Sequence, residues 1–517
     1  MIWHRTFQRT LVLALGCLLV VAAQASQKAF RVDTGLLTGE ILDENSGLRV
    51  YRGIPYAAPP EGDLRWKLPR RAEAWAGVLE ATEFSPGCVQ PDRRNRLAEL
   101  SEDCLYLNVW TAGNPAKPEL PVMVWIHGGG LNNGAGHLPG YDGAEMAKRG
   151  VVLVSINYRL GALGYLALPA LSAESKRGSG NYGFHDQIAA LEWVRRNIAV
   201  FGGDADNVTI FGESAGATSV HALLASPQAK GLFHRAISES AWVTDTNVAY
   251  LDRSGPFVGS TEADGLEWAE KVVGADKVAD LAALRAAPIG EIAAARFSPK
   301  ITIDGWFMPE RSESIFAMGK HHDVPLIVGT NRNEGTMFLG GFPYKKAEGM
   351  RKRLDTIYGE HGGSVAALYP VSDDAEIKSV LDRFVTDTWF LRASRAMLRG
   401  SAKTSSKAYH YQFTRQSRRR PEWGAHHAAE IGYAFNNLRG DNLEDTDHEL
   451  AEAMISYWVQ FAKTGDPNQP GLPVWPNWTP GSDIHLELGD EIIAGRALGK
   501  EQCEQLDQIV NQAWADD

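Results

Sequence analysis

The sequence predicts an α/β protein with a large, mostly parallel central sheet flanked by helices. Residues 122–126 are a continuous apolar run, and residues 151–156 are apolar apart from Ser155; such runs are typical of strands covered on both faces. Such runs alternate with glycine-rich turns and helical segments, as expected of an α/β fold. The chain has 517 residues, 44% of them hydrophobic, and shows no internal repeat or low-complexity linker. We therefore expect a single domain over residues 26–517.

The first 25 residues have the pattern of a secretory signal peptide. Arg5 and Arg9 precede an apolar run over residues 11–23, and an A-x-A cleavage pattern ends at Ala25. A membrane anchor is the alternative, but about 13 apolar residues are fewer than the roughly 20 that span a bilayer. We predict a secreted or periplasmic protein with no stable membrane span after cleavage. Its formal net charge of −11 argues against a nucleic-acid partner, because phosphate binding needs clustered Lys and Arg.

The cysteines agree with export. Cys88 and Cys104 are close enough in sequence to close a short loop, and disulfides persist outside the reducing cytosol, so we predict this disulfide. Cys503 is left over, either as a free buried thiol or as a site of pairing between chains. None of the three lies in a C-x-x-C or Cys/His spacing, so no zinc site is expected.

The next elements follow in chain order. Residues 30–42 alternate around glycines and predict a β-hairpin. Residues 51–60 contain three prolines and predict an extended strip along the surface. Residues 101–110 begin acidic and end strand-like, and a helix is expected over about 186–198. Later strands are predicted at residues 235–238 and 325–329.

Two long intervals, about 241–320 and 335–425, fit this alternation poorly. We expect them to supply helical insertions that cover the functional site. Residues 454–463 have apolar side chains at helical spacing, and Gly465 and Pro467 end the pattern. We interpret that helix as core packing.

The pattern G-x-S-x-G occupies residues 212–216, between a predicted strand at 208–211 and a predicted helix at 217–224. In a nucleophile elbow this turn is so tight that a Cβ at either glycine would clash, and the serine is pushed out with its Oγ exposed. The alternative is an ordinary strand-to-helix turn. The pattern alone makes Ser214 a candidate nucleophile.

Serine is a poor nucleophile at neutral pH, so Ser214 needs a base and an acid that orients the base. In an α/β sheet these follow in the order Ser, Asp or Glu, and His. Glu334 follows a predicted strand, where side chains gather at the carboxyl edge of the sheet. His427 lies in a later loop, with His426 as its rival. For either histidine the alternative is a packed loop residue.

Five segments carry a family resemblance: 102–108 (EDCLYLN), 127–130 (HGGG), 157–159 (NYR), 211–216 (FGESAG) and 461–468 (FAKTGDPN). Together they resemble the type B carboxylesterases, the cholinesterase-like branch of the α/β-hydrolases, from about residue 30 to 500. There is a weaker similarity to bacterial fumonisin esterases. The resemblance implies an α/β-hydrolase fold. It also implies a serine carboxylesterase that hydrolyses small-molecule carboxylic esters through an acyl-enzyme intermediate.

The resemblance also implies the roles of individual residues. By this resemblance Ser214 matches the family's nucleophile, Glu334 its catalytic acid and His427 its base. His427 is chosen because the family's histidine stands three residues before a glutamate, here Glu430. Glycine near the nucleophile lets backbone N–H groups approach the substrate carbonyl and stabilise developing charge. The oxyanion hole would then comprise the N–H groups of Gly129, Gly130 and Ala215.

Other similarities are structural. Arg65 with Glu102, and Arg159 with Asp186, match ion pairs of the family, although solvated surface charges are the alternative. Ser240 matches a serine that supports the catalytic acid.

The histidine loop departs from the family pattern. Ala428 stands where glycine commonly follows the histidine, and Gly432 stands where proline is usual. These changes bear on the conformation of the loop that carries His427, and not on the reaction that the resemblance implies.

Two other functions remain open at this stage, an acyltransferase with the same three residues and a non-catalytic binding or adhesion protein. No metal or organic cofactor is expected. A basic run comprises Arg415, Arg418, Arg419 and Arg420, and it could attract a substrate with free carboxylates. The alternative, a solvated surface run, is favoured. The sequence does not predict the physiological ester or the oligomeric state.

Overall fold

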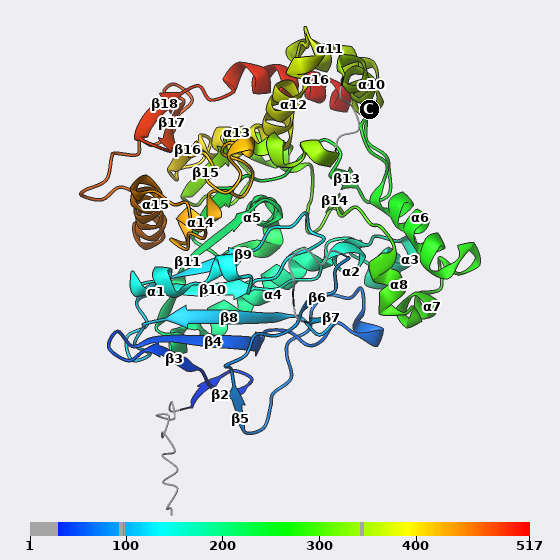
Figure 1. The fold of residues 1–517 in the computed structure, drawn as a ribbon. Helices are drawn as coiled ribbons and strands as arrows, with labels where there is room; N and C mark the ends of the chain where they lie inside the picture. Colours follow the sequence, from blue (N-terminus) through cyan, green and yellow to red (C-terminus); the bar gives the residue numbers. More distant parts are fainter. Residues whose placement is uncertain (1–28, 92–96, 98, 342–345, 517) are drawn as a thin grey trace, which may run out of the picture.

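The computed structural model describes residues 29–91, 97, 99–341 and 346–516. An eleven-stranded sheet forms its centre (Figure 1). In spatial order its strands are β18 (Ile492–Arg496), β17 (Ile484–Leu488), β16 (Ala408–Phe413), β15 (Leu326–Asn331), β12 (Arg235–Glu239), β11 (Gly203–Glu213), β9 (Leu120–Ile126), β10 (Val152–Ile156), β8 (Tyr106–Thr111), β4 (Leu48–Pro55) and β3 (Glu40–Asp43).

The sheet is parallel from β10 through β9, β11, β12, β15 and β16 to β17. Its edges are antiparallel, with β8, β4 and β3 at one end and β18 at the other. The predicted large, mostly parallel sheet is therefore confirmed. Smaller pairings also occur, and they involve β1 (Phe30–Val32), β2 (Gly35–Thr38), β5 (Val78–Glu80), β6 (Gly87–Cys88), β7 (Leu100–Ser101), β13 (Val248–Tyr250) and β14 (Ile301–Ile303).

Strand β9 shows why the central strands are apolar throughout. Val122, Val124 and Ile126 belong to the core on the side of helices α4 and α5, whereas Met123 and Trp125 belong to the core on the side of α15. Successive side chains of a strand point to opposite faces. Both faces are covered by helices, so neither set of side chains reaches water.

The helices surround this sheet and extend beyond it (Figure 1). They are α1 (Ala144–Lys148), α2 (Gly161–Tyr165), α3 (Pro169–Ser175), α4 (Tyr182–Asn197), α5 (Ala215–Ala225), α6 (Thr261–Val273), α7 (Leu281–Ala286), α8 (Ile289–Ala294), α9 (Ser312–Ala317), α10 (Ala347–Tyr358), α11 (Gly362–Leu368), α12 (Ile377–Val385), α13 (Arg392–Ser401), α14 (Ile431–Ala434), α15 (Asp445–Thr464) and α16 (Lys500–Asp516). The interval 241–320 supplies α6 to α9, and the interval 335–425 supplies α10 to α13. Helices α10, α11, α12 and α16 gather at the top of Figure 1, and α6, α7 and α8 lie at its right.

Residues 51–60 do not form a surface strip, so that prediction was wrong. Their first half belongs to β4, which pairs with β3 and β8 inside the central sheet. Tyr51 and Ile54 are 4% and 0% exposed. The prolines mark the end of the strand and the segment after it, since Pro55 is the last residue of β4.

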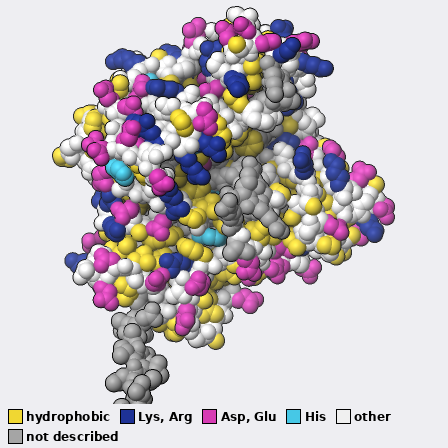
Figure 2. All heavy atoms as spheres, in the orientation of Figure 1, with side chains coloured by type: hydrophobic (Ala, Val, Ile, Leu, Met, Phe, Trp, Pro, Cys, Tyr) yellow, Lys and Arg dark blue, Asp and Glu magenta, His cyan; other side chains and the backbone are white. Residues whose placement is uncertain are grey.

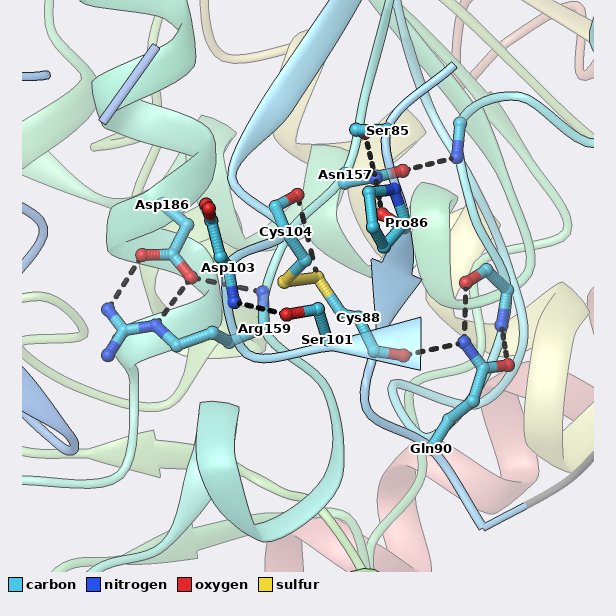
Figure 3. Close-up of a disulfide and its surroundings, with 12 residues drawn as sticks. Ser85, Pro86, Cys88, Gln90, Ser101, Asp103, Cys104, Asn157, Arg159 and Asp186 are labelled. Atoms are coloured by element: carbon cyan, nitrogen blue, oxygen red, sulfur yellow. Dashed lines mark hydrogen bonds and ion pairs between the residues drawn. A yellow bond between two sulfur atoms is a disulfide. The ribbon is translucent and has the colours of Figure 1, made fainter. Parts of the chain in front are cut away.

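The disulfide between Cys88 and Cys104 is present, as predicted, and the two Cα atoms lie 5.0 Å apart (Figure 3). Gln90 lies inside the loop that the disulfide closes, and its side chain forms hydrogen bonds with the glycine-rich segment after β9. Its Nε2 donates to the carbonyl oxygen of Gly134 at 3.0 Å, and its Oε1 accepts from the N–H of Gly134 at 2.9 Å. The covalent loop therefore supports the glycine-rich segment after β9.

Both predicted ion pairs are present. The guanidinium Nε of Arg65 lies 2.7 Å from Glu102 Oε2, and Arg159 Nη2 lies 2.7 Å from Asp186 Oδ1, as Figure 3 shows for the second pair. Both arginines are buried. A buried ion pair that loses one partner leaves an uncompensated charge, so these pairs fix the loops that carry them.

Two further sequence predictions concern the ends of the chain. The predicted signal peptide, residues 1–25, lies outside the described residues. Cys503 is buried and forms no disulfide with another cysteine of the described chain. Across the part of the chain that the structure describes, the helices lack a stretch long and apolar enough to cross a membrane.

Candidate active site

The predicted elbow joins β11 to α5. Ser214 stands between them with φ 56° and ψ −121°, a conformation that non-glycine residues rarely adopt. A Cβ on Gly212 would lie 2.5 Å from the carbonyl oxygen of Ile126, and one on Gly216 would lie 1.9 Å from the same atom. Both glycines are therefore required by the close approach of β9, as the pattern predicted.

Ser214, His427 and Glu334 come together although they are far apart in the chain. The Oγ of Ser214 lies 2.8 Å from Nε2 of His427, and Nδ1 of His427 lies 2.6 Å from Oε2 of Glu334. Because an ionised carboxylate only accepts hydrogen bonds, Nδ1 donates and Nε2 is free to accept the hydroxyl proton. The rival His426 is turned away, with its Nδ1 2.7 Å from the carbonyl oxygen of His427.

Glu334 is held from its other side. Its Oε1 accepts hydrogen bonds from Ser240 Oγ at 2.5 Å and from the N–H of Asn331 at 2.7 Å. Glu334 is 0% exposed. The supporting position predicted for Ser240 is therefore present, and these bonds fix the carboxylate that faces His427.

The electrostatics favour a positive charge on His427. Burial lowers its pKa, but the carboxylates of Glu213 and Glu334 outweigh burial, and the pKa is raised above the ordinary value. Oε1 of Glu213 lies 3.1 Å from His427 Nε2. The site is therefore built to stabilise an imidazolium beside the serine.

Three non-glycine residues of this site have positive φ, namely Ser214 (56°), Ser240 (58°) and Ala428 (66°). Strained backbone of this kind persists only where the surroundings enforce it. Ala428 is the position where the family commonly has glycine. The loop thus keeps the left-handed conformation without glycine, and His427 is nevertheless placed against Ser214.

Two of the three predicted oxyanion residues, Gly129 and Gly130, border the same space as Ser214, and the third, Ala215, follows Ser214 directly in the chain. Ala215 is also the first residue of α5. Gly129 has φ 115°, and a Cβ there would lie 1.9 Å from the carbonyl oxygen of Asn133. The loop is tied down by Tyr158, whose hydroxyl donates to the carbonyl oxygen of His127 at 2.7 Å.

The pocket at Ser214 has a volume of about 600 Å³ and a largely aromatic wall. Five aromatic side chains belong to that wall: Tyr141, Trp242, Phe338, Trp389 and Phe390. The rings of Phe338 and Phe390 also pack against His427, with centroids 5.2 and 4.6 Å from its ring. The sequence analysis missed these residues because no spacing rule marks them. Glu213 was within the elbow pattern but received no role.

Two arginines of the basic run, Arg415 and Arg418, are neutralised by the protein itself. Arg415 is 3% exposed and contacts the carboxylates of Asp447, Glu444 and Asp490 at 2.6 to 2.8 Å. Arg418 also pairs with Glu444. On the face drawn in Figure 2, acidic and basic side chains are intermixed. Among the described residues that line the pocket, none is Lys or Arg.

A further carboxyl lies under the elbow. Glu239 is 0% exposed, and its Oε1 accepts a hydrogen bond from Trp458 Nε1 at 2.9 Å. Its carbonyl oxygen accepts from the N–H of Ser214 at 2.9 Å. Burial raises the pKa of Glu239 to about 8, so the side chain is largely neutral at pH 7.

Replacing Glu239 with glutamine is expected to stabilise the protein increasingly as pH rises. The folded state binds this proton up to about pH 8, whereas the unfolded state releases it near the ordinary value of 4.5, so wild-type stability falls between these values. The glutamine has no such proton, and its amide oxygen can still accept from Trp458. The difference in the free energy of unfolding between the variant and wild type, from denaturant titrations, should increase by an amount on the order of 2–4 kcal/mol from pH 5 to pH 8.

The matched control for this experiment is Glu192→Gln, on the exposed side of α4. We expect its stability difference from wild type to stay flat over the same pH range. A Glu239→Gln protein that is less stable than wild type at pH 8 would contradict the assignment of a neutral, buried carboxyl.

Comparison with known proteins agrees with this geometry. A model of the carboxylesterase family matches residues 26–506. The chain is 36% identical over 491 residues to fumonisin B1 esterase of Sphingopyxis macrogoltabida, covering 89% of this chain and 87% of that protein. It is 38% identical over 470 residues to para-nitrobenzyl esterase of Bacillus subtilis (strain 168), covering 86% and 92% of the two chains.

Solved structures give the same result. A structure titled PNB esterase superposes with a TM-score of 0.81 at 34% sequence identity, and the match covers 93% of this chain and 99% of that one. The fold is thus the α/β-hydrolase fold that the sequence resemblance implied. Together with the matches above, it shows that the chain belongs to the carboxylesterase family and is a carboxylic ester hydrolase.

Proposed function

We propose that Ser214 is the nucleophile of this hydrolase, His427 its general base and Glu334 the acid that orients the base. The observation that carries the proposal is the continuous chain of contacts from Ser214 Oγ to His427 and on to Glu334, at 2.8 and 2.6 Å. Contacts of this length and order are what an activated serine requires.

The reaction then proceeds in two halves. His427 takes the proton of Ser214 as Oγ attacks the ester carbonyl, and the same proton is given to the departing alcohol as the ester C–O bond breaks. Water attacks the acyl-enzyme in the second half, with His427 again as base, and the acid is released. The N–H groups of Gly129, Gly130 and Ala215 would stabilise the oxyanion of both tetrahedral intermediates.

A fluorophosphonate probe tests the nucleophile. We expect one equivalent of probe per chain, loss of p-nitrophenyl acetate hydrolysis in parallel with labelling, and an adduct on the peptide that contains Ser214. Protein unfolded in denaturant should not react, because the serine is activated only by the folded site. Complete labelling that leaves hydrolysis intact, or an adduct on another residue, would reject the assignment.

For the substrate we propose neutral esters with apolar or aromatic groups. Aromatic side chains line the pocket, none of the described lining residues is Lys or Arg, and Arg415 and Arg418 of the basic run are paired with carboxylates of the protein. One relative is named for a para-nitrobenzyl ester and another for fumonisin B1. The aromatic side chains fit an apolar or aromatic group better than an anionic one, because the described residues that line the pocket include no Lys or Arg to compensate the desolvation of an anion.

We further propose that the protein is exported to the periplasm or secreted. The signal pattern over residues 1–25 and the disulfide between Cys88 and Cys104 support this.

A further inference from the structure

The loop that carries His427 contains a strained turn. The N–H of Ala429 donates to the carbonyl oxygen of His426 at 3.1 Å, which closes a turn over residues 426–429. Ala428 is the third residue of this turn and has φ 66°. Glycine or asparagine is preferred at such a position, because a Cβ is disfavoured in the left-handed region. The conformation of Ala428 therefore needs support from outside the turn.

The side chain of Asn331 contacts this turn on both sides of Ala428. Asn331 is the last residue of β15 and is 0% exposed. Its Nδ2 donates to the carbonyl oxygen of His426 at 2.7 Å, and the same Nδ2 donates to Oε2 of Glu430. These two acceptors stand two residues before and two residues after Ala428. A single amide group thus connects the two ends of the segment that contains the strained residue.

The side chain and the backbone of Asn331 have separate partners. The carbonyl oxygen of His426 can only accept a hydrogen bond, so the amide nitrogen of the side chain must face it. The backbone N–H of Asn331 instead donates to Oε1 of Glu334 at 2.7 Å. The backbone therefore supports the acid, whereas the side chain supports the loop that carries the base.

We propose that Asn331 is a positioning residue whose side chain holds Ala428 in the left-handed conformation. The turn then keeps the imidazole of the adjacent His427 in its 2.8 Å contact with Ser214 Oγ. Without the amide, the turn relaxes to conformations in which Ala428 has negative φ, and His427 moves away from the serine. This inference rests on the proposed function, because His427 must act as the base.

The first test is Asn331→Ala. We expect kcat for p-nitrophenyl acetate to fall about 5- to 30-fold, which corresponds to the cost of a left-handed alanine. KM should stay within about twofold of wild type, because Asn331 is not one of the described residues that line the pocket. Fluorophosphonate labelling of Ser214 should slow by the same factor as kcat. The backbone N–H that supports Glu334 is retained in this variant.

The second test asks whether glycine at position 428 compensates for the lost amide. Ala428→Gly removes the Cβ that disfavours the left-handed conformation, so the turn needs less support. In protein that carries Ala428→Gly, adding Asn331→Ala should lower kcat at most ~3-fold. Wild type, the two single variants and the double variant form a double-mutant cycle that measures this coupling. A merely structural role would give no such rescue, because glycine replaces none of the lost hydrogen bonds.

Asn333→Ala is the matched control. Asn333 is half-buried and contacts the same loop, since its Oδ1 accepts from the N–H of Ala425 at 3.2 Å. Its Nδ2 donates to Asp382 Oδ2 at 2.9 Å. Asn333 thus contacts the loop on one side of Ala428 only. Any loss of kcat caused by Asn333→Ala should be the same with alanine or glycine at position 428.

A second variant covers a failure of Asn331→Ala to fold, which denaturant titration would reveal. Asn331→Ser retains a hydroxyl, but its single proton cannot be donated to both acceptors. We expect a loss of kcat in the same direction, with the same rescue by Ala428→Gly.

The outcomes are separable. Wild-type protein that hydrolyses the ester but is labelled at a residue other than Ser214 would reject the proposed function itself. With Ser214 labelled in wild type, folded Asn331 variants that keep wild-type kcat would overturn the positioning role alone. An equal loss with alanine and glycine at position 428 would also overturn it, as would an equal rescue of Asn333→Ala.

Discussion

Replacing Ser214 with alanine is expected to lower kcat for p-nitrophenyl acetate by at least ~10³-fold, with losses near 10⁶ within the range seen for such sites. The change removes the one atom that can form the acyl-enzyme. The wall of the pocket and the oxyanion N–H groups stay in place, so substrate binding should change little. Steady-state kinetics on purified protein give kcat and KM separately.

Stability provides the first check on this result. The Oγ of Ser214 contacts the imidazole of His427, and the residue's backbone already has φ 56°, so alanine meets the same strain and loses one hydrogen bond. The free energy of unfolding, measured by denaturant titration, should therefore stay within about 1 kcal/mol of the wild-type value. Ser175→Ala, at the exposed end of α3, is the serine control and should keep wild-type kinetics. Full activity in folded Ser214→Ala protein would reject Ser214 as nucleophile.

The elbow and its partners could be predicted because each depends on a local pattern. Gly212 and Gly216 are fixed by the close approach of β9, and the order of Ser214, Glu334 and His427 along the chain follows from the topology of the sheet. Strands β9 and β10 were evident because both of their faces are buried. Local chemistry and fold agree at these positions, which makes the pattern informative.

The last strands of the sheet could not be predicted for the opposite reason. In β17 the alternating sequence IHLEL is only five residues long, and β16 carries a histidine and a glutamine within an interval assigned to helices. Their places are set by pairing with neighbours that are distant in sequence, including Tyr411 of β16 with Leu486 of β17. Non-local pairing of this kind leaves little trace in a single segment.

The basic run illustrates a limit of charge patterns. The sequence left Arg415 to solvent, the favoured alternative, or to an anionic substrate, because its partners, Asp447 and Asp490, lie 32 and 75 residues further along the chain. Once the chain folds, Arg415 joins the start of α15 to the loop after β17. The aromatic wall of the pocket was hidden in the same way, since Trp242 and Trp389 meet only in the folded protein, with ring centroids 6.4 Å apart.

Replacing His427 with glutamine is expected to lower kcat at least ~10³-fold, whereas His426→Gln should stay within about fivefold of wild type. The adjacent histidines differ in what they contact. His427 joins Ser214 to Glu334, while the Nδ1 of half-buried His426 faces a backbone carbonyl and its ring packs against Trp423. Fluorophosphonate labelling rates should follow the same order, because both readouts depend on a base at Ser214.

The pair of variants decides between two histidines that the sequence left as rivals. A glutamine at position 427 is uncharged and cannot take up the proton of Ser214, and Glu213 and Glu334 both lose the imidazole that they contact. If His426→Gln instead abolishes hydrolysis while folded His427→Gln retains it, the base is His426, and the loop must rearrange by turning Ala428 and its neighbours before catalysis.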